Sequence, residues 1–113
     1  VMGQEAYDWF MGDNVEKRAP NYRNQVTVES LEIGMNYDPT ATLQLISPTP
    51  FLMIIASDDI ITPTELEKKA FERAREPKKL IVVPGRHFDA YHGPKHDAFA
   101  LPAVDWFKQH LKP

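Results

Sequence analysis

An acidic pair and a histidine are the residues of this sequence whose types and spacing could do chemistry. Asp58 and Asp59 directly follow an apolar run over residues 51–56, and His87 comes shortly after a second apolar run over residues 80–83. A carboxylate that accepts a hydrogen bond from one imidazole nitrogen fixes the tautomer of the ring and stabilises its protonated form. The other nitrogen can then take a proton from a nucleophile. The pattern therefore indicates a carboxylate–histidine pair that serves as a general base.

Two strands and a connecting helix must bring these residues together. The runs at 51–56 and 80–83 are apolar throughout, which is typical of strands buried on both faces. Residues 65–75 have apolar side chains at helical spacing, and Thr64 with Glu67 predicts a capping box at their start. Strands joined by a helix are expected to be parallel, with a right-handed crossover. Their carboxyl ends then share one sheet edge, where open α/β sheets bind ligands.

Further helices are predicted on either side of this unit. Residues 4–12 predict a short helix, and residues 25–36 predict a second one that Asn24 can cap. Residues 13–24 are polar and predict a loop. A last helix closes the chain, and Pro102 begins or kinks it. The side chains expected to face the core are Leu66, Ala70, Phe71 and Ala74 in the central helix and Phe99, Val104, Phe107 and Leu111 in the last helix.

Composition excludes several classes of protein. The chain has 113 residues, of which 42% are hydrophobic and 26% charged, as expected for one small folded domain. Its net charge is −3 without a basic stripe, so nucleic acid is not an expected partner. No apolar run approaches the roughly 20 residues of a membrane helix. The sequence has no cysteine, which does not fix the compartment, and it opens without a signal-peptide pattern. We expect a cytoplasmic protein.

The segment around the acidic pair resembles the acid-bearing strand and loop of the α/β-hydrolase superfamily. That family often has the motif Gly-x-x-Asp-x-x-x-Pro. Within residues 49–63, Asp59 lies four residues before Pro63, and Ala56 takes the place of the glycine. The resemblance implies that Asp59 is the catalytic acid. Asp58 is the alternative that the residues alone leave open.

The histidine loop carries the second part of the resemblance. Residues 80–91, with the Pro-Gly turn before His87, are similar to the last strand and histidine loop of the family, and residues 106–111 are similar to its closing helix. The resemblance implies that His87 is the catalytic base. The fold class it implies is α/β: a parallel strand–helix–strand–helix C-terminal part of an α/β-hydrolase sheet over residues 47–113. We expect a helical excursion or lid-like segment over residues 1–46 to precede it, and residues 47–113 to form one structural unit that is an incomplete domain.

The nucleophile of such an enzyme is missing from the sequence. The family order is serine, acid, histidine, so the serine is expected upstream. No Gly-x-Ser-x-Gly elbow occurs, the oxyanion-hole segment is absent, and the serines present are Ser30, Ser47 and Ser57. We therefore expect this chain alone to be inactive. As part of a parent enzyme it is expected to contribute to esterase- or peptidase-like hydrolysis of a small-molecule ester or amide, with no cofactor.

Other interpretations remain open from the residues. The chain could be a catalytically silent fragment or truncated paralogue that acts as a folded or assembling module. A metal site is a third reading, although its candidate ligands have no recognised spacing; they are His87, Asp89, His92, His96 and Asp97. Asp89 and Tyr91 are more simply expected to brace the histidine loop. The aromatic residues Tyr7, Trp9 and Phe10 are expected to pack, with a substrate pocket as the alternative.

The predicted sheet also needs a partner. Two strands form a marginal sheet in water, and an apolar edge at residues 51–56 is a template for another strand. The expected partner is the remainder of the parent polypeptide or a second copy of this chain.

Overall fold

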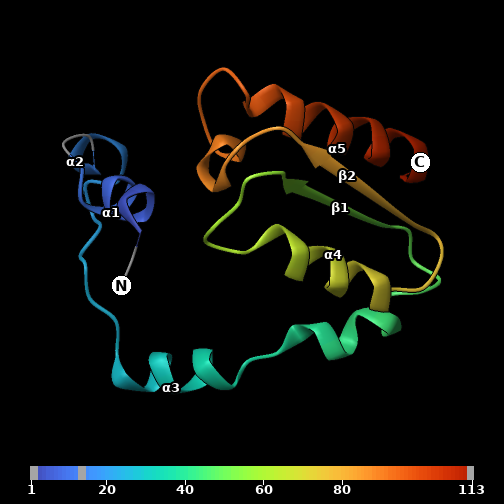
Figure 1. Cartoon of the computed structure of the whole chain (residues 1–113), viewed down its shortest axis with the longest axis horizontal. Coiled ribbons are helices and arrows are strands. Elements are labelled where there is room, and N and C mark those ends of the chain that lie inside the picture. Colours follow the sequence, from blue (N-terminus) through green and yellow to red (C-terminus); the bar gives the residue numbers. More distant parts are fainter. Residues whose placement is uncertain (1–2, 13–14, 112–113) are drawn as a thin grey trace. The chain divides into compact units, whose positions relative to one another are not determined.

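The computed structural model describes residues 3–12 and 15–111, which fall into two compact units that divide between Asp38 and Pro39 (Figure 1). Each unit has its own set of elements. Among the described residues, no helix is long and apolar enough to span a membrane.

The first unit is helical. It contains α1 (Gln4–Met11), α2 (Val15–Arg18) and α3 (Val28–Asn36). The prediction of α1 is confirmed, whereas α2 lies in a stretch that we predicted to be a loop. The N-cap of α3 is Thr27, not Asn24, because the Thr27 hydroxyl oxygen accepts a hydrogen bond from the Ser30 N–H at 3.1 Å.

The second unit is a strand–helix–strand–helix arrangement with two short 3₁₀ helices. Its elements are η1 (Pro39–Leu45), β1 (Phe51–Ala56), α4 (Thr64–Arg73), β2 (Lys78–Val83), η2 (His87–Ala90) and α5 (His96–His110). β1 and β2 are parallel along their whole length, from Phe51 opposite Lys78 to Ala56 opposite Val83, as predicted. β2 begins two residues earlier than expected because Lys78 and Lys79 pair with Phe51 and Leu52 of β1. The Lys78 ammonium group donates to the Phe71 carbonyl oxygen at 2.9 Å and lies over the face of the Phe71 ring.

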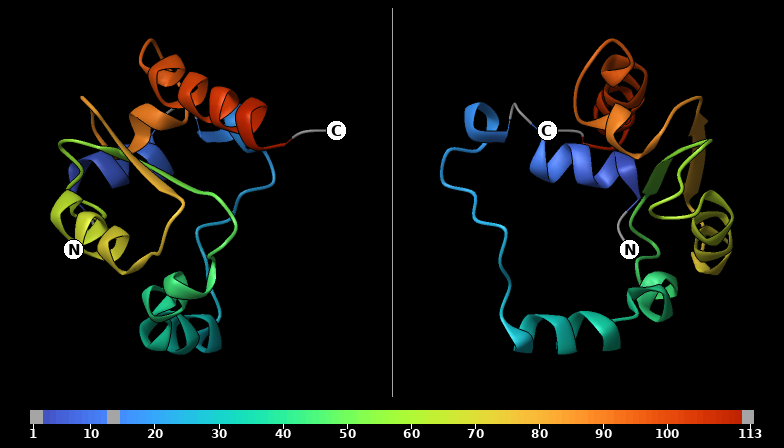
Figure 2. Two further views of the ribbon diagram at one scale, coloured as in Figure 1. Left: turned by 90° about the vertical axis from the view of Figure 1, so that its right-hand side faces the viewer. Right: turned by 60° about the vertical axis from the view of Figure 1, so that its left-hand side comes forward.

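The two long helices of this unit lie on opposite faces of the sheet, as Figures 1 and 2 show. On the α4 face, the ring of Phe51 stacks on that of Phe71 with 6.2 Å between centroids. On the α5 face, the buried core consists of Ala56, Val83 and Phe99. This follows from the alternation of side chains along a strand. The α/β fold class is therefore confirmed.

The core is smaller than the sequence predicted. Phe99 and Ala74 are buried, but the side chains of Leu66, Val104, Phe107 and Leu111 are exposed. Among the described residues the sheet has two strands, which is too narrow to cover the apolar surface that the two helices present. These four side chains were expected in the core, and that expectation is wrong for this chain.

The predicted capping box at α4 is also wrong. Thr64 is the first residue of the helix, and its hydroxyl donates to the Ala56 carbonyl oxygen at 2.8 Å. The Pro63 carbonyl oxygen accepts from the N–H groups of Leu66 and Glu67. The buried Thr64 hydroxyl thus ties α4 to the end of β1, and the Glu67 side chain is available for a different contact.

Candidate active site

The chain segments that leave the two strands stay hydrogen-bonded beyond the sheet. The Ser57 N–H donates to the Val83 carbonyl oxygen and the Asp58 N–H donates to the Gly85 carbonyl oxygen, both at 2.9 Å. The Gly85 N–H in turn donates to the Ser57 hydroxyl oxygen at 3.3 Å. These contacts fix the two loops relative to each other immediately before the candidate catalytic residues Asp59 and His87.

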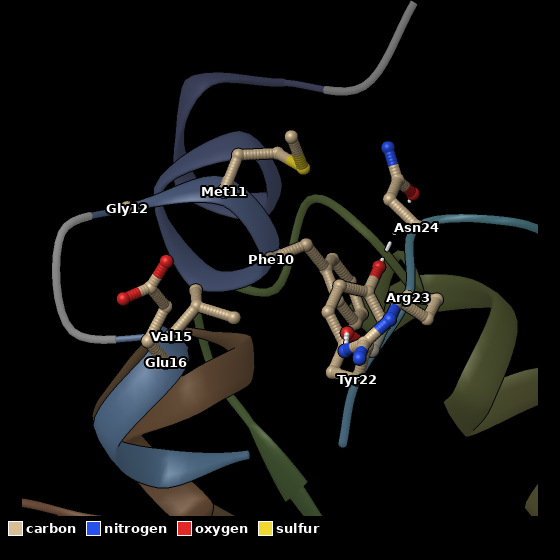
Figure 3. A pocket seen from close by; sticks show the side chains of 8 residues that line it. All are labelled: Phe10, Met11, Gly12, Val15, Glu16, Tyr22, Arg23 and Asn24. Atoms are coloured by element: carbon tan, nitrogen blue, oxygen red, sulfur yellow. Dashed lines mark hydrogen bonds between the residues drawn. The ribbon is translucent and has the colours of Figure 1, made fainter. Parts of the chain in front are cut away.

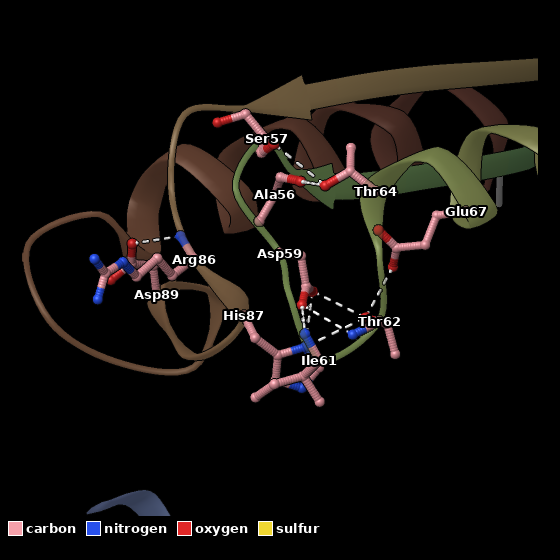
Figure 4. Close-up of polar contacts among 10 residues, drawn as sticks. All are labelled: Ala56, Ser57, Asp59, Ile61, Thr62, Thr64, Glu67, Arg86, His87 and Asp89. Carbon is pink, nitrogen blue, oxygen red and sulfur yellow. Dashed lines mark hydrogen bonds and ion pairs between the residues drawn. The ribbon is translucent and has the colours of Figure 1, made fainter. Parts of the chain in front are cut away.

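Asp59 and His87 meet at this edge. His87 Nδ1 lies 2.8 Å from Asp59 Oδ2 (Figure 4), so the predicted contact between them is confirmed. The Asp59 side chain is 5% exposed and the His87 side chain is 20% exposed. Among residues 3–12 and 15–111, no group hydrogen-bonds to His87 Nε2. Because the Asp59 carboxylate accepts from His87 Nδ1, the expected tautomer of His87 carries its proton on Nδ1 and leaves Nε2 as the basic atom.

The Asp59 carboxylate is held by a tight turn. Its Oδ1 accepts from the N–H groups of Ile61 and Thr62 at 2.8 and 2.9 Å, and its Oδ2 also accepts from the Thr62 hydroxyl at 2.9 Å. Burial by itself would raise the pKa of Asp59. The hydrogen bonds from His87, Thr62 and Ile61 together outweigh burial, and the pKa is lowered below its ordinary value. The ionised form of the Asp59 carboxyl group is therefore favoured.

Asp58 has a different environment. It is exposed, and its Oδ2 accepts a hydrogen bond from the Ser57 hydroxyl at 2.6 Å. Asp59, not Asp58, is thus the member of the acidic pair that contacts His87.

The loop that carries His87 is braced by Asp89, as the sequence predicted. Asp89 Oδ2 accepts from the Arg86 N–H at 2.8 Å and from Lys95 Nζ at 3.0 Å. The Arg86 N–H, followed by the Lys95 ammonium group, lowers the pKa of Asp89. Tyr91 contributes a ring contact, with its centroid 5.9 Å from that of His87. Both contacts limit the orientations open to the imidazole.

The candidate metal ligands do not converge. His87 contacts Asp59, Asp89 contacts Lys95, and His96 contacts Asp97 at 3.4 Å. Within the part of the chain that the structure describes, no three His, Asp or Glu side chains gather as a metal site would require. The three serines do not reach His87 either: Ser30 lies in α3, Ser47 donates to the Glu76 carbonyl oxygen and Ser57 donates to Asp58.

Two side chains, those of Thr62 and Glu67, lie at this site although the sequence did not predict them there. Thr62 contacts Asp59 and also lies with its Oγ1 3.3 Å from His87 Nδ1 and 3.3 Å from Glu67 Oε1. An aspartate side chain in a turn commonly accepts from backbone N–H groups shortly after it, which was the available signal for a contact between Asp59 and the Ile61–Thr62 segment. The position of Glu67 had no such signal, because it depends on how α4 packs.

The first unit contains a separate pocket of about 520 Å³ (Figure 3). Its apolar wall includes the stacked rings of Phe10 and Tyr22, with Met11 and Val15. The Tyr22 hydroxyl donates to Asn24 Oδ1 at 3.2 Å. Of the aromatic cluster, Phe10 lines this pocket, while the Trp9 ring lies beneath the Arg18 guanidinium group at 4.0 Å.

A solved structure with a similar sequence has the same fold, and two curated proteins have a similar sequence. A solved structure of the α/β hydrolase GrgF from Penicillium sp. sh18 superimposes with a TM-score of 0.76 at 27% identity, over 95% of this chain and 36% of that one. The polyketide transferase ATR5 of Stachybotrys chlorohalonatus is 27% identical over 97% of this chain and 40% of its own length. A thiohydrolase of Eupenicillium brefeldianum is 30% identical over 83% of this chain and 30% of its own length. This chain belongs to the α/β-hydrolase superfamily.

No protein-family model matches the chain. The chain spans 30–40% of the length of these two curated relatives.

Proposed function

We propose that this chain supplies the general base His87 and the orienting acid Asp59 of a serine-type α/β-hydrolase that acts on acyl substrates. The observation that carries the proposal is the 2.8 Å contact between His87 Nδ1 and Asp59 Oδ2, with Nε2 left without a hydrogen-bond partner among the described residues. A lone surface histidine would not need a buried carboxylate behind it. Here the carboxylate is held by four donors and stays ionised.

The serine belongs to a part of the parent polypeptide upstream of this chain. The 113 residues contain no elbow serine, and the relatives are more than twice as long. In the first step the serine hydroxyl oxygen bonds to the acyl carbon while its proton passes to His87 Nε2. The leaving group then takes that proton as its bond to the acyl carbon breaks. In the second step a water oxygen bonds to the acyl carbon while its proton passes to His87 Nε2. The serine oxygen then takes that proton as its bond to the acyl carbon breaks, and the acid is released.

The substrate class we propose is an acyl thioester or ester. Some relatives are named polyketide transferases and others thiohydrolases, which are names for transfer and cleavage of such groups. A thiolate is a better leaving group than an amine, so a protonated His87 has less to contribute to that departure than in peptide hydrolysis.

The experiment that tests this function is labelling of the polypeptide that carries this chain with a fluorophosphonate, which modifies activated serines. Mass spectrometry should find one modified serine, outside residues 1–113 and in a strand-to-helix elbow. Substitution His87→Gln should slow the labelling by about 10²-fold or more, because the serine loses its base. Absence of labelling would favour the alternative, a catalytically silent module.

A further inference from the structure

The hydrogen-bonded system behind His87 extends past Asp59 to a second carboxyl group. Thr62 Oγ1 lies 2.9 Å from Asp59 Oδ2 and 3.3 Å from Glu67 Oε1 (Figure 4). A hydroxyl group has one hydrogen, so Thr62 can donate to only one of the two carboxyl groups. The shorter distance assigns that hydrogen to Asp59. Glu67 can then bond to Thr62 only by donating a proton of its own.

The surroundings of Glu67 favour the form that carries this proton. Its Oε2 atom is buried and has no hydrogen-bond partner among the described residues, which is more costly for a charged oxygen than for a neutral one. Burial and then the negative charge of Asp59 raise the pKa of Glu67, and His87 lowers it; the Thr62 hydroxyl lowers it only if it donates to the Glu67 carboxylate. Since the pKa of Asp59 is lowered, a range of pH exists in which Glu67 is protonated and Asp59 ionised.

Two influences oppose protonation. Glu67 lies in the first turn of α4, where the helix dipole favours a carboxylate. From the other elements packed against it, the charged groups that act on Glu67 are His87, from η2, which also opposes protonation, and Asp59, from the loop after β1, which favours it. The direction of the Thr62–Glu67 hydrogen bond therefore distinguishes a neutral acid from a carboxylate.

We propose that Glu67 is a neutral carboxylic acid that donates to Thr62, and that Thr62 and Glu67 are positioning residues for the Asp59–His87 pair. With Glu67 protonated, the Thr62 hydrogen is committed to Asp59 Oδ2, beside the hydrogen from His87. With Glu67 ionised, two carboxylates compete for the Thr62 hydrogen, and the orientation of the Asp59 carboxylate is fixed less firmly. The inference rests on the proposed function in so far as this pair is catalytic.

The direction of the hydrogen bond is tested by carboxyl ¹³C NMR on the folded polypeptide that carries this chain. Glu67→Gln assigns the Glu67 signal. Thr62→Val should lower the pKa of Glu67 by about 0.5–1 pH unit, because it removes an acceptor that stabilises the protonated form. The control Thr62→Ser retains the hydroxyl and should leave it unchanged. A rise in the Thr62→Val variant would mean that Thr62 donates to a carboxylate, and it would overturn the proposal.

The positioning role is tested by the low-field Nδ1–H resonance of His87. Glu67→Gln should keep this signal, since its amide can still donate to Thr62, whereas the non-polar Glu67→Met should broaden or lose it. A signal unchanged in both variants would refute the positioning role. If Glu67→Met does not fold, the sign of the Thr62→Val shift still decides. These measurements use no substrate, so inactivity towards acyl compounds would refute the proposed function and leave this inference to be judged separately.

Discussion

Asp59 Oδ2 lies 2.8 Å from His87 Nδ1, whereas the adjacent carboxyl group of Asp58 is exposed and bonds to Ser57. Asp59→Asn keeps the shape of the side chain but removes the charge that stabilises the imidazolium. We expect kcat/KM of the parent enzyme to fall about 10²–10⁴-fold. Asp58→Asn is the matched control and should change it by less than about threefold, because a solvent-exposed charge is strongly screened. Equal losses in both variants would contradict the assignment of Asp59.

The histidine loop should be sensitive to a single methyl group at Gly85. A Cβ atom at Gly85 would lie 2.8 Å from Asp89 Oδ2, and that oxygen is held by Arg86 and Lys95. Gly85→Ala should therefore lower the free energy of unfolding by about 1–3 kcal/mol. Gly34→Ala, in α3 with open space around it, should instead raise it by up to about 1 kcal/mol. Urea denaturation of both variants checks the contrast, and an equal or higher stability of Gly85→Ala would show that the loop can yield.

The two carboxyl groups behind His87 should act on stability in opposite directions as pH changes. The folded-state pKa of Asp59 is lowered, so its contribution is present above its unfolded pKa near 3.8 and is lost as pH falls through the folded value. The folded-state pKa of Glu67 is raised above its unfolded value near 4.5. Its contribution to stability is therefore present below the unfolded pKa and is lost as pH rises through the folded-state pKa.

Glu67→Gln should consequently stabilise the fold at pH 7 relative to the wild type, with the gain disappearing near pH 4. Urea denaturation across pH 3–8 measures the difference. A gain that is the same at both ends would show that Glu67 does not change its protonation in this range.

The isolated chain should not persist as a monomer. Among the described residues β1 pairs only with β2, so the backbone groups on its other edge have no strand partner. Apolar side chains also remain exposed on α4 and α5, including Leu66 and Phe107. We expect residues 1–113 to associate with the rest of the parent polypeptide or, when produced alone, with another copy. Light scattering decides: a cooperatively folded species of 13.0 kDa at micromolar concentration would be contrary to this expectation.

The sequence predicted the residues of the site better than the packing of the side chains around it. The position of Asp59 and His87 follows from two facts visible in the sequence, strand-length apolar runs and the common edge of parallel strands. The exposure of Val104 and Phe107 could not be predicted, because helical periodicity tells which side chains share a face but not whether anything covers that face. Thr64 was misassigned for a related reason: its hydroxyl bonds across the fold to Ala56, and not locally to the start of its own helix.

The most direct test of the account is the rate at which the parent polypeptide hydrolyses a simple acyl thioester, compared between wild type, His87→Gln and His96→Gln. His96 is the control because it is a second histidine whose partner is an exposed neighbour, Asp97. We predict that His87→Gln lowers kcat about 10²–10⁴-fold, that His96→Gln changes it by less than about threefold, and that residues 1–113 alone give no turnover above background. Turnover that survives in a folded His87→Gln protein would contradict the role of His87 as the general base.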